Sequence, residues 1–175
     1  MTKLKMGMVG GGIGAFIGEV HRKAARMDGG VEFVAGAFDI DPEKSLEQGR
    51  ILGVDPKRTY RTYDEMIKAE LALPKGERVD FISICTPNHT HFPIAKACLE
   101  AGFNVMCEKP MTLTVEQALE LDALVKKTKL TFGLMHTYTG YPMVKLARDM
   151  VKAGDVPREV EGQMPERHPP RASVV

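Results

Sequence analysis

Short apolar runs alternate with segments of helical pattern along this chain, and that alternation constrains the fold more than any other feature of the sequence. Five runs of mainly apolar residues, each bounded by turn-forming or charged residues, cover 4–9, 31–38, 79–85, 103–107 and 131–136. Strands that are buried on both faces have this near-continuous apolar character. Because strands joined through helices pair in parallel, the sequence predicts a doubly wound, mostly parallel α/β sheet.

The segments between these runs carry signals for helix starts and stops. An N-cap residue followed by proline, or a capping box, marks a helix start, and glycine marks a helix end. The start signals are Asp41-Pro42, Thr62-x-x-Glu65 and Thr114-x-x-Gln117, and the stop signals are Gly102 and Gly154. Apolar residues recur at helical spacing through 142–153, which predicts one more helix there.

Composition limits the classes of partner. The 175 residues, 43% hydrophobic and 27% charged, are typical of a globular domain, and a net charge of +1 without a basic cluster gives no footprint for nucleic acid. No apolar run approaches the roughly 18 residues of a membrane span. The start "MTKLKMGMVGGG" enters a strand at once, without the pattern of a signal peptide, and the three cysteines are odd in number. We therefore expect a cytoplasmic protein without nucleic-acid or membrane partners.

The first strand runs into the glycine-rich turn "VGGGIGAFIGEVH". Glycines allow a phosphate to approach a helix N-terminus, where free N–H groups and the helix dipole hold the anion. Two spacings fit: G-x-G-x-x-A from Gly10 to Ala15, or a pattern that uses Gly18 as its last glycine. This turn predicts dinucleotide binding in a Rossmann fold, with a plain flexible loop as the alternative. The candidate residues are Gly10, Gly12, Ile13 and Gly14.

Asp39 ends the second strand run, 21 positions after Gly18. An acid at this place accepts hydrogen bonds from the adenosine ribose hydroxyls, and its charge repels a 2′-phosphate. The sequence therefore favours NAD as the cofactor, with NADP possible if a basic side chain lies nearby. Asp41 has the alternative role of a helix N-cap.

A further set of candidates follows the third strand run, in "ICTPNHTHFP". Ligands of open α/β sheets bind beyond the carboxyl ends of the strands. The spacing of His89 and His91 is a poor match to a metal site, so no metal is expected. We expect contacts with the cofactor from Thr86, Pro87, Asn88 and His91.

Four stretches in this order and spacing, "GGGIGAFIGEVHRKAA", "SICTPNHTH", "NVMCEKP" and "HTYTGYPMV", resemble the Gfo/Idh/MocA family of nicotinamide-dependent sugar and inositol oxidoreductases. The resemblance covers about residues 3 to 156. The chain departs from the family pattern at 138–140, where many members have an arginine. The resemblance implies a dinucleotide-binding domain over 1–156 and hydride transfer between nicotinamide and a hydroxyl of a polyol or sugar.

The most specific element of the resemblance is the triplet Glu108-Lys109-Pro110. By resemblance Lys109 is the catalytic residue, and Glu108 and Lys109 lie beside the cofactor. Independently, a cation beside a hydroxyl that loses its proton stabilises alkoxide-like charge. We therefore interpret Lys109 as an electrostatic stabiliser, with a histidine elsewhere moving the proton. Tight functional turns and the resemblance both favour a cis Lys109–Pro110 bond.

The residues after Val156 read "PREVEGQMPERHPPRASVV", with four prolines and no apolar period. We expect an irregular or disordered tail over 157–175 that does not fix His168. These residues do not show the strand that leads into the second domain of the family, so we do not expect the oligomer that is typical of the family. The alternatives are a non-catalytic dinucleotide-binding module, a truncated gene product, or a short-chain dehydrogenase whose pair would be Tyr141-x-x-x-Lys145.

Overall fold

The structure, a computed structural model, describes residues 2–155, which form two compact units that divide between Met135 and His136. Each unit is described by itself. The strands of the first unit are β1 (Leu4–Gly10), β2 (Val31–Ala37), β3 (Phe81–Cys85), β4 (Asn104–Glu108) and β5 (Phe132–Met135). Its helices are α1 (Phe16–Arg26), α2 (Pro42–Leu52), α3 (Tyr63–Ala72), α4 (His91–Glu100) and α5 (Val115–Thr128), with short 3-10 turns η1 (Pro56–Arg58) and η2 (Asn88–Thr90).

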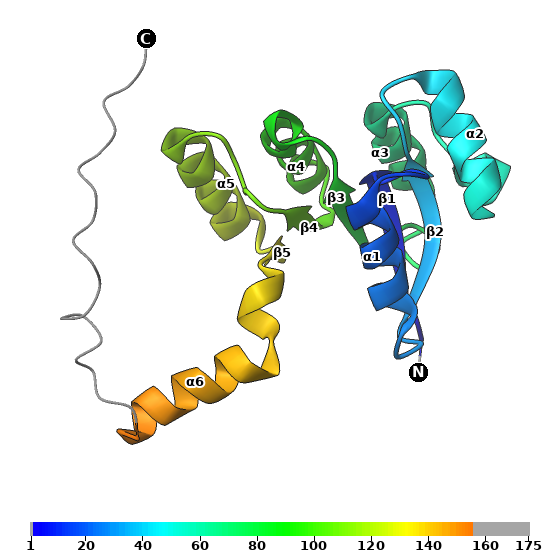
Figure 1. Cartoon of the computed structure of the whole chain (residues 1–175). Coiled ribbons are helices and arrows are strands. Elements are labelled where there is room, and N and C mark those ends of the chain that lie inside the picture. The colour runs from blue at the N-terminus through cyan, green and yellow to red at the C-terminus, as the bar shows by residue number, and fades with distance from the viewer. Residues whose placement is uncertain (1, 156–175) are drawn as a thin grey trace, which may run out of the picture. The chain divides into compact units, whose positions relative to one another are not determined.

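The five strands form one parallel sheet in the order β2-β1-β3-β4-β5. The order reverses direction between β1 and β3, which is the switch point where open α/β sheets bind ligands. Figure 1 shows α3, α4 and α5 along one face of this sheet and α1 on the other. The predicted doubly wound α/β class is therefore confirmed, and each of the five apolar runs overlaps one strand to within a few residues.

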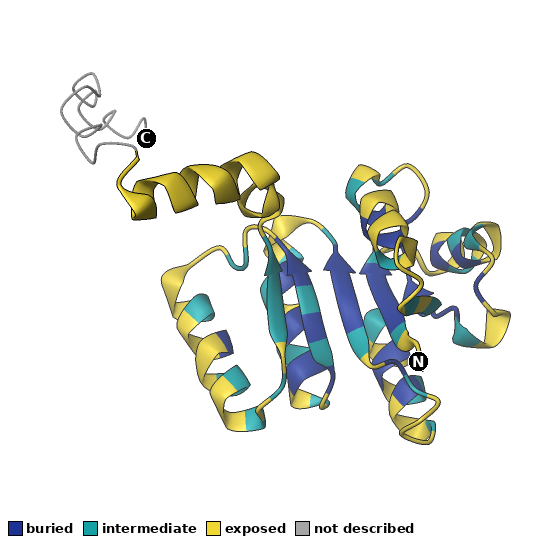
Figure 2. Ribbon diagram, turned by 90° about the horizontal axis from the view of Figure 1, so that it is seen from below, coloured by how far each residue is buried: buried dark blue, intermediate teal, exposed yellow. Residues whose placement is uncertain are grey.

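Two buried clusters hold the helices to the sheet. The larger cluster lies between the sheet and α3, α4 and α5, around Ile82, Ile84 and Leu99, all of which are fully buried. The smaller cluster lies on the α1 face, around Met6 and Met8. Figure 2 shows the buried strands between helices whose outer faces are exposed. Burial on both faces explains why the strand sequences are almost continuously apolar.

The helix starts follow the predicted caps. The carboxylate of Asp41 accepts hydrogen bonds from the backbone N–H groups of Glu43 and Lys44. The hydroxyl oxygens of Thr62 and Thr114 accept in the same way at α3 and α5. These bonds satisfy donors that a helix N-terminus leaves free, so the sequence signals acted through the expected chemistry.

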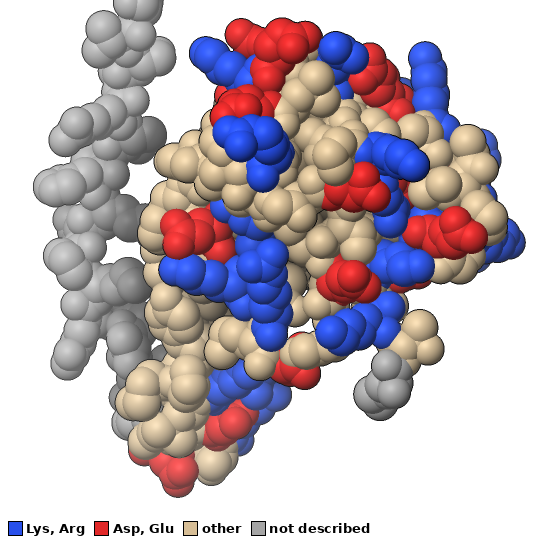
Figure 3. Space-filling view, turned by 90° about the vertical axis from the view of Figure 1, so that its right-hand side faces the viewer, with Lys and Arg blue, Asp and Glu red and all other residues tan. Residues whose placement is uncertain are grey.

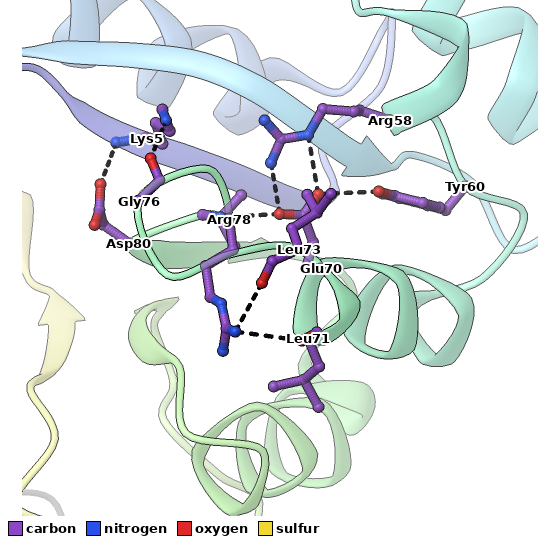
Figure 4. A network of polar contacts seen from close by, with 10 residues as sticks. Lys5, Arg58, Tyr60, Glu70, Leu71, Leu73, Gly76, Arg78 and Asp80 are labelled. Carbon is purple, nitrogen blue, oxygen red and sulfur yellow. Dashed lines mark hydrogen bonds and ion pairs between the residues drawn. The ribbon is translucent and has the colours of Figure 1, made fainter.

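A buried carboxylate ties α3 to the strands. Glu70 is fully buried, and its carboxylate accepts two hydrogen bonds from the Arg58 guanidinium, one from the Tyr60 hydroxyl and one from the backbone N–H of Val79 (Figure 4). The Tyr60 backbone N–H donates to the carbonyl of Gly36 in β2 at 2.9 Å. This network holds the segment before α3 against the edge of the sheet.

Charged side chains of both signs are mixed over the face of the molecule that Figure 3 displays. Some ion pairs on the surface join residues three or four positions apart, such as Glu19 with Lys23 and Glu47 with Arg50. Others join different helices, such as Lys96 with Glu120. Within the described residues, no helix has both the length and the apolar character that crossing a membrane requires. The expectation about nucleic acid stays a prediction.

The second unit consists, in its described part, of η3 (Thr137–Gly140) and α6 (Pro142–Ala153). The helix predicted over 142–153 is confirmed, and Gly154 ends it in the left-handed region at φ 84°. The rings of Tyr138 and Tyr141 pack edge to face with centroids 5.6 Å apart. The tail expected over 157–175, with His168, lies outside the described residues, and the boundary near 156 stays a prediction.

Candidate functional site

A cavity of about 530 Å³ lies at the carboxyl ends of β1, β2 and β3. This volume is within the range of roughly 300–1,000 Å³ that is typical of small-molecule and cofactor sites. The cavity has mainly apolar walls and a few polar groups. The candidates that line it are Gly10, Gly12, Ile13, Asp39, Thr86 and Pro87, together with their neighbours Gly11, Ala15, His89 and Thr90. Gly14, Asn88, His91, Glu108 and Lys109 are not in the lining.

The backbone of the glycine-rich turn has a conformation and close contacts that residues with a Cβ atom could not adopt without strain. Gly10, Gly11 and Gly14 have φ of 73°, 67° and 86°, in the left-handed region where only glycine is free of strain. A Cβ on Gly12 would stand 3.0 Å from the Gln48 side-chain oxygen and 3.1 Å from the Phe38 carbonyl oxygen. The turn can therefore present bare backbone to an anionic group at the start of α1.

Of the two glycine spacings, the structure supports the one that includes Gly18. This residue lies in α1 and is buried against the backbone of Gly11, whereas Ala15 is the N-cap of the helix. Close packing of helix against turn is the role of the last glycine in a dinucleotide-binding turn. Of the three residues between Gly14 and Gly18, Phe16 and Ile17 already belong to α1.

Asp39 is half-buried at the end of β2 and lines the cavity. One carboxylate oxygen accepts from the backbone N–H of Asp41 at 2.9 Å, which fixes the carboxylate at the strand end. Each of its two oxygens carries two lone pairs, so acceptor capacity remains for a ribose diol. The separate roles expected for Asp39 and Asp41 are both compatible with these contacts.

Only some of the candidates that follow β3 lie at the cavity. Thr86 and Pro87 line the cavity, but Asn88 and His91 do not. His91 is fully buried, with its two ring nitrogens 2.7 Å from the Pro110 carbonyl oxygen and 2.9 Å from the Thr86 carbonyl oxygen. Both nitrogens therefore face the protein's own backbone, and His91 holds the loop to the turn after β4.

The Glu108-Lys109-Pro110 turn follows β4, and its Lys109–Pro110 bond is cis, as expected. The Lys109 side chain is exposed, and within the described part of the chain its amine makes no hydrogen bond or ion pair. Glu108 is buried, and its carboxylate oxygens take hydrogen bonds from the His21 ring and from the Lys109 backbone N–H. The Glu108 carboxylate thus contacts protein groups, away from the Lys109 amine.

Several cavity residues were not expected from the sequence. Gln48 of α2 accepts a hydrogen bond from the Ile13 backbone N–H, so a phosphate oxygen that uses this donor must displace the Gln48 amide. Four further residues that the sequence did not indicate come from the segment at the start of α3, which are Arg61, Thr62, Tyr63 and Asp64. This segment reaches the cavity because Thr59 makes a bridge to Gly36 in β2, a long-range pairing that no local pattern signals.

The cysteines do not offer a reactive thiolate. Burial raises the pKa of Cys85, which lines the cavity, to about 11, and raises the pKa of Cys98 and Cys107 to about 12. All three thiols are free and stay protonated near neutral pH. Among residues 2–155, no group of three or more histidine, cysteine or acidic side chains is placed to hold a metal.

These features fit a dinucleotide. The glycine-rich turn leaves room for a pyrophosphate at the start of α1, and Asp39 lies where an adenosine ribose would be held. Thr86 and Pro87 border the same cavity at the end of β3. The arrangement therefore provides an anion site, a ribose acceptor and apolar walls in one continuous space.

Comparison with known proteins agrees with the geometry. Residues 4–136 match the family model described as an oxidoreductase family with an NAD-binding Rossmann fold. The uncharacterized oxidoreductase YfiI of Bacillus subtilis is 40% identical over 152 residues, which are 86% of this chain and 38% of that protein. The rhizopine catabolism protein MocA of Rhizobium meliloti is 31% identical over 88% of this chain and 44% of its own length.

Among solved structures, an inositol dehydrogenase homolog from Azotobacter vinelandii, complexed with NADH and myo-inositol, has a TM-score of 0.85 and 40% identity. The match covers 89% of this chain and 41% of that one. An oxidoreductase from Pseudomonas syringae gives a TM-score of 0.84 and 43% identity over 89% of this chain. The chain thus spans about two fifths of the length of these relatives.

Proposed function

The chain belongs to the Gfo/Idh/MocA oxidoreductase family, and from that premise we propose that it is the NAD-binding part of a dehydrogenase that acts on a polyol or sugar. The observation that carries the proposal is the single cavity that joins the glycine-rich turn, Asp39 and the loop after β3. NAD, when bound, supplies or accepts the hydride. The family match argues against the short-chain dehydrogenase alternative.

In this proposal each part of the cavity has one task. The backbone of Gly10, Gly12 and Ile13 receives the pyrophosphate at the positive end of α1, and Gly14, outside the lining, gives the turn its left-handed bend. Asp39 accepts hydrogen bonds from the adenosine ribose and disfavours a 2′-phosphate. Arg61 lines the same cavity, with its guanidinium 3.5 Å from the Glu43 carboxylate, and this cation can reduce the discrimination against NADP.

We assign the nicotinamide end to the side of the sheet where Thr86, Pro87 and Lys109 follow β3 and β4. There the Lys109 amine is free to stabilise negative charge on a substrate oxygen as its proton leaves. Among the described residues, Glu108 forms no ion pair with that amine; its carboxylate instead accepts from His21 and from the Lys109 backbone N–H. His91 and Asn88 stand outside the cavity, so we assign them to the support of the loop.

The substrate class comes from the relatives. One solved relative contains myo-inositol, and one curated relative is named levoglucosan dehydrogenase. We therefore propose that the whole protein moves a hydride between nicotinamide and the carbon that bears a hydroxyl of a polyol or sugar, and that this hydroxyl becomes a carbonyl when the carbon gives up the hydride. The three free buried thiols fit a reducing compartment, so we place the protein in the cytoplasm.

Titration of the purified chain with NADH, followed by nicotinamide fluorescence, tests the proposal. We expect saturable binding that is tighter for NADH than for NADPH. A Gly12→Val variant, whose side chain would meet Gln48 and the Phe38 carbonyl, should lose binding while it keeps its circular dichroism spectrum. No binding by the wild-type chain would refute the proposed function.

A further inference from the structure

Two adjacent buried residues of α1 reach both turns that the proposed function uses. His21 and Arg22 are 5% and 7% exposed, although helix α1 is otherwise mainly exposed. The Arg22 guanidinium donates to the Gly11 carbonyl oxygen in the glycine-rich turn. His21 extends to Glu108, directly before Lys109. One helix turn is thus bonded to the pyrophosphate side and to the lysine side of the site.

The hydrogen bonds of the His21 ring run in one direction, from Ser83 through His21 to Glu108. Its Nδ1 lies 2.8 Å from the Ser83 hydroxyl in β3, and its Nε2 lies 2.9 Å from a Glu108 carboxylate oxygen in β4. A carboxylate can only accept, so Nε2 carries a proton toward Glu108, and in the neutral ring Nδ1 accepts from Ser83. The other Glu108 oxygen accepts from the Lys109 backbone N–H at 3.1 Å. Both ring nitrogens of His21, the Ser83 hydroxyl and both carboxylate oxygens of Glu108 therefore have hydrogen-bond partners.

A serine, a histidine and a carboxylate in sequence also suggest nucleophilic catalysis, but the surroundings exclude it. Ser83 is fully buried and lies outside the cavity lining, so no substrate reaches its hydroxyl. A buried network whose members are all satisfied fixes geometry, because any movement would leave a polar group unpaired in the interior.

We propose that His21 is a positioning residue, which fixes the Lys109 backbone through Glu108 and thereby joins the lysine turn to the helix that carries the glycine-rich turn. The importance of this contact for catalysis rests on the proposed role of Lys109. The hydrogen bonds from His21 to Glu108 and from the Lys109 backbone to Glu108 are present in the protein without cofactor, so they can be tested without cofactor. It explains why a carboxylate precedes Lys109 although it makes no contact with the amine.

The test measures hydrogen exchange at the Lys109 backbone amide by NMR, in the chain without cofactor. The Lys109 signal is identified by selective ¹⁵N-lysine labelling and by its absence in Lys109→Arg. The matched variants are His21→Met and His21→Gln, whose side chains have similar length but differ in the polar amide. We expect exchange at Lys109 to be about tenfold faster in His21→Met, the size of one lost charge-assisted hydrogen bond, and close to wild type in His21→Gln.

The Val105 amide, which donates to the Thr131 carbonyl in the same region, is the internal reference. Equal acceleration at Val105 and Lys109 would show that His21 only stabilises the fold, and unchanged exchange at Lys109 would also overturn the proposal. If His21→Met does not fold, Ser83→Ala removes the hydroxyl that orients the ring, together with its weak contact to the Cys85 thiol, and it should accelerate exchange at Lys109 selectively. The NADH titration of the wild-type chain reports separately on the proposed function.

Discussion

A Cβ on Gly18 would stand 2.3 Å from the carbonyl oxygen of Gly11, so helix α1 and the glycine-rich turn pack backbone against backbone. Real Cβ contacts are never this short, and the obstacle is main chain that no rotamer change can move. The contact holds the helix N-terminus at the turn, where its free N–H groups can meet an anion. The identity of residue 18 therefore matters to stability and to cofactor binding together.

Gly18→Ala should destabilise the chain by roughly 1–3 kcal/mol, the usual cost of inserting a methyl group into closely packed structure. Its NADH affinity should fall as well, because α1 must move away from the turn. Urea unfolding and NADH fluorescence measure the two effects. Gly76→Ala is the matched control, since a Cβ there meets nothing within 4 Å and its φ is not in the left-handed region. Equal stability of the two variants would contradict the packing argument.

Asp39→Ala should weaken NADH binding about tenfold or more, since hydrogen bonds to a charged acceptor contribute about 1.5–3 kcal/mol. NADPH binding should weaken less or improve, because the charge that repels the 2′-phosphate is gone. Fluorescence titrations with both cofactors measure the ratio of the NADH affinity to the NADPH affinity. Asp41→Asn removes a neighbouring charge while asparagine keeps the N-cap, and it should leave the ratio unchanged. The same change of ratio in both variants would show a long-range charge effect.

Glu70→Gln should cost about 3–5 kcal/mol in the free energy of unfolding. The amide nitrogen of glutamine would face donors, and the Arg58 guanidinium would lose its carboxylate partner. Urea unfolding measures the loss. Glu47→Gln is the control, because its pair with Arg50 is exposed to solvent and should contribute little to the free energy of unfolding. A loss below about 1 kcal/mol for Glu70→Gln would mean that the network is solvated.

Stability should fall steeply in alkaline solution. Burial, reinforced by the Glu70 carboxylate, raises the pKa of Tyr60 to about 12, and burial raises the pKa of Cys98 to about 12. A raised folded-state pKa means that the unfolded chain loses its proton first, so the stabilisation is complete below about pH 9 and is lost as pH rises through 11–12. Urea midpoints between pH 8 and 11 check this. Cys98→Ala should flatten the decline, and a constant midpoint would contradict the burial.

The sequence predicted those features that depend on local chemistry. Helix starts at Asp41, Thr62 and Thr114 were correct because capping acts over three or four residues, and strand positions followed from apolar runs buried on both faces. Gln48 and the start of α3 were missed as cavity residues, because the Gly36–Thr59 bridge that places the latter joins segments far apart in the chain. His91 was expected beside the cofactor, but it does not line the cavity, and its ring nitrogens face backbone carbonyls. The position of a residue after a strand does not reveal where its ring points.

The last prediction separates binding from chemistry at Lys109. Lys109 does not line the cavity, so Lys109→Met should change NADH affinity by less than about threefold, which corresponds to well under 1 kcal/mol.

For turnover, a substrate carbon must be held about 3–3.5 Å from the nicotinamide and kept from water. The described residues provide the cofactor side of such a site, so we expect the 175-residue chain to bind NADH without measurable turnover. Incubation with NAD and a panel of inositols, aldoses and sugar acids, followed at the reduced-nicotinamide absorbance, tests this. Turnover by the wild-type chain that disappears in Lys109→Met would show that these residues form a complete substrate site by themselves.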